Sequence, residues 1–93
     1  IVSESHPDTL EQSEVAEELI GLREIILYND DVNTFDWVIE CLIEICDHSP
    51  EQAEQCSIIV HYKGKCGVKT GSYEELEPLC SALQERQLSA QIE

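Results

Sequence analysis

The spacing of apolar residues changes several times after residue 22, and each change predicts an element of structure. Residues 23–28 contain the continuous apolar run Ile25-Ile26-Leu27-Tyr28, which predicts a strand. From about Thr34 the apolar residues recur every three or four positions, and this spacing predicts a helix that ends near Asp47-His48. Its apolar face comprises Trp37, Val38, Cys41, Leu42, Ile45 and Cys46.

A second helix is predicted directly after the first. Ser49 suits the N-cap, Pro50 suits the first helical position, and Gln52 occupies the capping-box position. Gly64 is a natural end for this helix. The residues predicted to be buried are Ala53, Cys56, Ile59 and Val60.

The remaining chain predicts a strand, a third helix and a final strand. Residues 65–70 alternate, with Cys66 and Val68 facing inward, and residues 88–92 alternate again. Between them, a capping box at Ser72 opens a helix that Pro78 should either kink or delay. The predicted fold class is therefore α+β: a compact β-α-α-β-α-β domain with a three-stranded, mainly antiparallel sheet covered by helices on one side.

Residues 1–22 differ from the rest because they are acidic and contain few apolar positions. This composition predicts a flexible acidic N-terminal extension (1–22) ahead of a core domain (23–93). Over the whole chain the net charge is −15, which argues against nucleic acid and anionic membrane surfaces as partners. Five cysteines without C-x-x-C spacing favour reduced thiols in a cytoplasmic protein, with no metal or other cofactor.

Candidate chemistry is concentrated where the first strand meets the first helix. Asn29-Asp30-Asp31 places short side chains with oxygen acceptors at one junction, and such an arrangement suits an ammonium group. The alternative is that these residues only form a turn, since turns and N-caps favour Asn and Asp.

His61 lies at the C-terminal end of the second predicted helix. If the first two helices pack together, four residues can form a shallow apolar cup beside it: Phe35, Val38, Ser57 and Val60. Asn29 and Asp30 would then share the rim of that cup with His61. The alternative is a helix-terminal histidine that bonds a backbone carbonyl.

Two motifs together resemble the ClpS adaptor family: Asn29-Asp30-Asp31, and Val60-His61-Tyr62-Lys63-Gly64-Lys65 followed by Cys66-Gly67-Val68. The resemblance covers 24–93, apart from a short deletion before Cys66. It implies a monomeric, non-enzymatic adaptor that binds the first residue of N-end-rule substrates. The adaptor would deliver these substrates to a Clp-family AAA+ unfoldase, ClpA- or ClpC-like, and its peptidase.

The resemblance also implies roles for individual positions. The α-amino group of a substrate would be bound by Asn29, Asp30 and His61. Its side chain would enter a pocket lined by Phe35, Val38, Ser57, Val60 and Leu88, with Asn33 as a small polar rim residue. One carboxylate and two neutral acceptors can satisfy an ammonium group but not an acetylated terminus.

Three positions depart from the family pattern. Ser57 stands where the family usually has methionine or another bulky apolar residue, so the preference among large first residues is open. Ser72 and Glu77 stand where members commonly carry Glu and Lys that face the unfoldase, so the partner is open as well.

Two other protein classes compete with this interpretation. Ribosomal stalk proteins have a similar fold without the Asn-Asp-His cluster and would not bind amino-terminal peptides. A small hydrolase would use His61 with Ser57 four residues earlier, but no glycine motif for an oxyanion hole follows.

Overall fold

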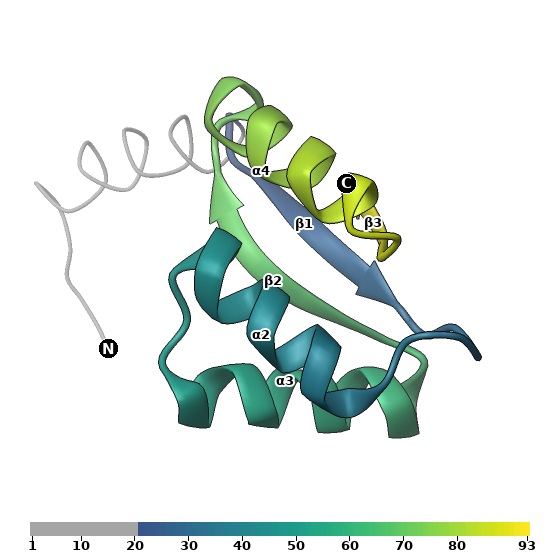
Figure 1. Cartoon of the computed structure of the whole chain (residues 1–93). Coiled ribbons are helices and arrows are strands. Elements are labelled where there is room, and N and C mark those ends of the chain that lie inside the picture. Colours follow the sequence, from purple (N-terminus) through teal and green to yellow (C-terminus); the bar gives the residue numbers. More distant parts are fainter. Residues whose placement is uncertain (1–20) are drawn as a thin grey trace, which may run out of the picture.

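The computed structural model describes residues 21–93, and their elements follow the predicted order β-α-α-β-α-β (Figure 1). The elements are β1 (Arg23–Tyr28), α2 (Phe35–Cys46), α3 (Pro50–Lys63), β2 (Lys65–Gly71), α4 (Tyr73–Glu85) and β3 (Ser89–Ile92). The predicted flexible extension over 1–22 falls almost entirely on residues 1–20, which lie outside the described residues.

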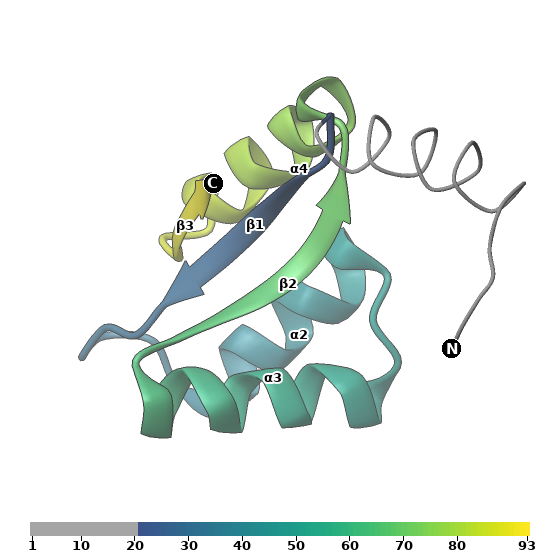
Figure 2. The same ribbon diagram turned by 180° about the vertical axis from the view of Figure 1, so that it is seen from behind.

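The sheet has the strand order β2-β1-β3. Both strand pairs are antiparallel, which agrees with the predicted antiparallel sheet. Alternate residues of β1 face the core, where Ile25 is 0% exposed and Leu27 is 2% exposed. Leu27 lies opposite Cys66 on one side and the buried Ala90 on the other. Within residues 21–93 the helices cover this one face of the sheet, and Figure 2 shows β1 and β2 from behind.

The predicted caps fix where the helices begin and end. The Thr34 hydroxyl accepts a hydrogen bond from the Trp37 amide at 3.2 Å, and the Ser49 hydroxyl accepts one from the Gln52 amide at 3.1 Å. Gly64 ends α3 with φ at 95°, a left-handed conformation that glycine adopts without steric cost.

The helix α4 does not start late, so that alternative of the prediction is wrong. Ser72 and Glu75 form a reciprocal capping box, and α4 begins at Tyr73 and continues through Pro78. The two hydrogen bonds of the box fix the first turn ahead of the proline. The proline then removes only one intrahelical donor.

Two contacts attach the end of α2 and the loop that follows it to β2. The ring of His48 is only 5% exposed, and its Nε2 lies 2.6 Å from the carbonyl oxygen of Val68. Lys69 donates to the carbonyl of Cys46, the last residue of α2, at 3.3 Å.

At the opposite end of this helix pair, the Asn29 amide donates to the Gly64 carbonyl at 2.9 Å. The N-terminus of α2 and the C-terminus of α3 therefore meet the end of β1.

Candidate functional site

A hollow of about 310 Å³ lies where the end of β1, the start of α2 and the end of α3 meet. Its polar side belongs to the loop after β1, and its apolar side belongs to the two helices. The residues that line it are Asn29, Asp30, Asp31, Asn33, Thr34, Phe35, Val38, Ser57, Val60 and His61.

The structure brings together eight of the nine residues that the sequence predicts for the site, because all of them except Leu88 line this hollow. Leu88 is 4% exposed and lines a void of about 30 Å³ that also touches Asp30, Val38 and Val60. Asp31 and Thr34 also line the hollow. Asp31 belongs to the acceptor cluster that the sequence indicates, but neither residue was assigned a role in ligand binding.

Asp30 organises the loop by accepting three hydrogen bonds. Its Oδ1 accepts from the amides of Val32 and Asn33, each at 2.8 Å, and its Oδ2 accepts from the side-chain amide of Asn33 at 2.8 Å. Asp30 therefore stabilises a turn. These bonds do not exclude ligand binding, since an ionised carboxylate has about four lone-pair sites.

The same bonds determine the charge of Asp30. Burial by itself raises the pKa of the carboxyl, but the donors from Asn33 and Val32 outweigh it and hold the pKa below its usual value. Asp30 is therefore ionised at neutral pH. The hollow thus has a negative charge at its polar rim.

His61 stands at the rim between two aromatic rings. Its ring centroid is 5.2 Å from that of Phe35 and 4.8 Å from that of Tyr62, and both pairs meet edge to face. Phe35 belongs to the first turn of α2 and is 43% exposed, so its contact with His61 joins the two helices at the open end of the hollow.

The inner wall of the hollow is apolar. Val60 is 6% exposed and Ser57 is 3% exposed, and the Ser57 hydroxyl donates to the carbonyl of Ala53 at 2.8 Å. Because this hydroxyl is engaged within α3, Ser57 offers the hollow a small side chain rather than a free donor. The bond also directs the hydroxyl toward Ala53 and not toward His61, which disfavours the hydrolase alternative.

These features define the class of protein: a small α+β domain with an apolar hollow and an ionised acceptor, Asp30, at its rim. Such a hollow suits a ligand with an apolar side chain beside a cationic donor group. The chain belongs to the ClpS family, because the family described as "ATP-dependent Clp protease adaptor protein ClpS" matches residues 22–91.

Curated relatives agree with this membership. The chain is 41% identical over 64 residues to the ATP-dependent Clp protease adapter protein ClpS of Campylobacter jejuni (strain 81-176), covering 67% of this chain. It spans 65% of the length of that relative. It is 34% identical over 77 residues to the protein of the same name from Escherichia coli O1:K1 / APEC, covering 73% of each chain.

A solved structure shares the fold. It is described as "The structure of Agrobacterium tumefaciens ClpS2 bound to L-phenylalaninamide", and it matches with a TM-score of 0.73 and 19% identity over 78% of this chain and 95% of that one. The fold implied by the family resemblance is therefore confirmed. Within residues 21–93, no helix is both long enough and apolar enough to cross a membrane.

Proposed function

We propose that this protein is a non-enzymatic adaptor that binds the first residue of N-end-rule substrates and delivers them to a Clp AAA+ unfoldase. The observation that carries the proposal is the ionised Asp30 at the rim of an apolar hollow. A free amino terminus followed by a large apolar side chain supplies the two groups that this arrangement suits. The Agrobacterium relative is described as bound to L-phenylalaninamide, which has both groups.

In this proposal the polar rim and the apolar wall have separate roles. Asn29, Asp30 and His61 bind the α-ammonium group, whose three donors and positive charge require acceptors. The first side chain enters the hollow against the residues of the two helices. Those residues are Phe35, Val38, Ser57 and Val60, with Leu88 behind them and Asn33 at the rim.

The size of the hollow supports one large side chain as the ligand. Its volume of about 310 Å³ lies at the lower end of the range of roughly 300–1,000 Å³ that is typical of small-molecule sites. Ser57 contributes less bulk than the methionine common in the family, so we propose that aromatic first residues fit as well as leucine.

The partner in this proposal is a ClpA- or ClpC-like unfoldase that docks on α4. Ser72 and Glu77 replace the residues with which the family faces the unfoldase, and the hydroxyl and amide of Ser72 are both engaged in the capping box. We therefore expect the docking contacts to differ in detail from those of other members. We propose that the adaptor acts as a monomer in the cytoplasm, where reduced cysteines are the rule.

A panel of peptides that differ only in their first residue tests the proposal. Phe-, Leu-, Trp- and Tyr-initial peptides should bind tighter than Ser- or Glu-initial ones, by roughly 50-fold for leucine over serine if three carbons are buried at about 0.8 kcal/mol each. The bound peptides should be recovered uncleaved. Equal affinity across the panel, or cleavage of the peptides, would contradict the proposal.

A further inference from the structure

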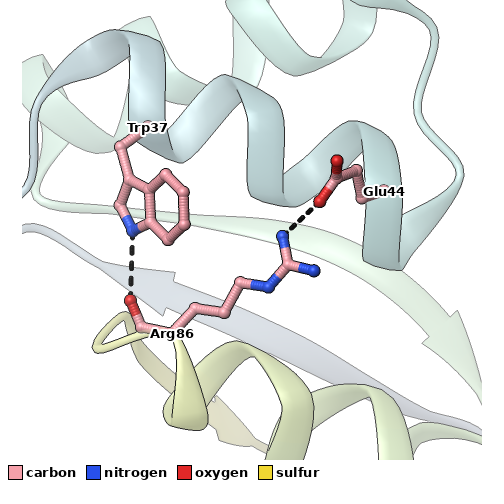
Figure 3. Close-up of polar contacts among 3 residues, drawn as sticks. All are labelled: Trp37, Glu44 and Arg86. Carbon is pink, nitrogen blue, oxygen red and sulfur yellow. Dashed lines mark hydrogen bonds and ion pairs between the residues drawn. The ribbon is translucent and has the colours of Figure 1, made fainter.

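The turn between α4 and β3 presents two consecutive carbonyl groups to the start of α2. The carbonyl of Arg86 accepts from the indole Nε1 of Trp37 at 3.1 Å, as Figure 3 shows. The carbonyl of Gln87 accepts from the side-chain amide of Asn33 at 2.9 Å. Gln87 has φ at 73°, a left-handed conformation that reverses the chain ahead of β3. The shape of this turn therefore sets the direction of both carbonyls.

The side chain of Arg86 attaches the turn to α2 a second time. Its guanidinium lies 5.8 Å from the centre of the Trp37 ring and forms an ion pair with Glu44, seven residues further along the helix (Figure 3). Trp37 is thus held from two sides, by the Arg86 carbonyl at its indole nitrogen and by the Arg86 guanidinium over its ring. The turn cannot shift along α2 without breaking these contacts.

Asn33 connects the turn to the acidic group of the site. Its Nδ2 has two hydrogens, and it donates to Oδ2 of Asp30 at 2.8 Å and to the Gln87 carbonyl at 2.9 Å. Both partners can only accept, so the nitrogen and not the oxygen of the amide must face them. The backbone amides of Val32 and Asn33 hold Oδ1 of Asp30, whereas the bond to Oδ2 depends on the Asn33 amide and so on the position of the Gln87 carbonyl.

We infer that the α4–β3 turn positions Asp30 for the amino group of the ligand. Trp37 and Arg86 hold the turn, the Gln87 carbonyl orients the Asn33 amide, and that amide orients Asp30. Trp37 and Arg86 do not line the hollow, so they are positioning residues rather than ligand contacts. The inference rests on the proposed function, because it assigns the turn a role in binding an amine.

The substitution Trp37→Phe removes the indole N–H and keeps an aromatic ring under Arg86. We expect it to weaken the binding of free-amine peptides by roughly three- to tenfold. This factor corresponds to the net free energy of one hydrogen bond, lost from the binding of the peptide. The factor should be the same for Leu-initial and Phe-initial peptides, because the wall of the hollow is unchanged. The matched control is Tyr73→Phe, which removes the hydroxyl of an exposed tyrosine at the other end of α4.

A double-mutant cycle separates positioning from general stability. If Trp37 acts through Asn33, then Trp37→Phe should cause no further loss of affinity in an Asn33→Ala background. Losses that multiply in the double variant, or a Trp37→Phe protein that binds within twofold of wild type, would overturn the inference. Glu44→Gln, which breaks only the ion pair, provides a second and milder perturbation with an expected loss in the same direction.

A carboxyl titration of Asp30 by NMR in the free protein provides a readout that does not depend on peptide. The hydrogen bond from the Asn33 side chain lowers the pKa of Asp30, so the pKa should rise in Asn33→Ala, which lacks this donor. It should rise by less in Trp37→Phe, which keeps the donor but loosens the turn that orients it. An unchanged titration in Trp37→Phe would overturn the inference even if wild type binds peptide. If wild type binds no free-amine peptide, the proposed function is wrong, whereas the titration still tests the link from Trp37 to Asp30.

Discussion

Replacing Ser57 by methionine adds bulk to the wall of the hollow without changing its charge. Ser57 is 3% exposed, lines the hollow, and uses its hydroxyl only to donate to Ala53 within α3. Methionine is a good helix former and has no polar hydrogen that would need a partner. We therefore expect Ser57→Met to fold normally and to extend into the space of about 310 Å³ that the ligand side chain would use.

The expected loss of affinity follows from the volume added. Methionine has two more heavy atoms than serine, which would displace the equivalent of about two CH₂ groups of a large ligand side chain. At about 0.8 kcal/mol for each group this is about 1.6 kcal/mol, or roughly fifteenfold in affinity. The loss should be largest for Trp- and Phe-initial peptides and smaller for Leu-initial ones, so the rank order of first residues should change.

Fluorescence titration of Trp-, Phe-, Tyr-, Leu- and Ile-initial peptides against both proteins measures this change. The control is Ile58→Met, which places the same side chain at the next position of α3, where the residue is 37% exposed and does not line the hollow. Ile58→Met should leave every affinity unchanged. If Ser57→Met also leaves the rank order and the affinities unchanged, Ser57 does not contact the ligand side chain and the assignment of this wall is wrong.

Three further predictions concern the site and the fold. Asp30→Ala should weaken the binding of free-amine peptides by about 2–5 kcal/mol, as for truncating one partner of a buried charge pair, and a folded variant with wild-type affinity would contradict this. Hydrogen bonds from the amide and hydroxyl of Ser72 lower the pKa of Glu75 in the folded protein. The ionised Glu75 therefore stabilises the fold above its unfolded pKa of about 4.3, and this stabilisation is lost as pH falls through its folded pKa. Urea unfolding should therefore show that the stability difference between wild type and Glu75→Gln shrinks from pH 7 to pH 3; a constant difference would refute it. Burial raises the pKa of the Cys46 thiol to about 11. Alkylation at pH 8 should therefore modify the partly exposed Cys66 before Cys46, as mass mapping of the labelled sites can show. Earlier labelling of Cys46 would contradict its burial in the core.

The features that the sequence predicted well are those governed by local rules. The caps at Thr34, Ser49 and Ser72 and the helix end at Gly64 depend on residues within a few positions of each other. The order of the strands in the sheet was not predicted: β3 pairs with β1 and not with β2, which precedes it in the chain. Of the two effects predicted for Pro78, the late start of α4 is wrong, because the capping box ahead of the proline fixes the first turn.

The contacts that the sequence did not predict join distant parts of the chain. Asn33 reaches Gln87 across 54 positions, Trp37 reaches Arg86 across 49, and His48 reaches Val68 across 20. Single side chains that bond backbone carbonyls leave no periodic pattern in a sequence, so nothing marked these pairs. For Asp30 the sequence left a choice between a turn residue and a ligand-binding residue. The structure shows the turn bonds, and the proposed function adds the ligand to the same carboxylate.

One measurement tests the central claim most directly: the affinity of a single Phe-initial peptide with its α-amino group either free or acetylated. Acetylation removes the positive charge and two of the three donors that Asn29, Asp30 and His61 are proposed to bind, while the phenyl ring stays unchanged. The free peptide should bind and the acetylated peptide should lose at least roughly 30-fold in affinity, the lower end of the cost of truncating a buried charge pair. If both forms bind equally well, the hollow does not recognise an amino terminus, and the account of this site is wrong.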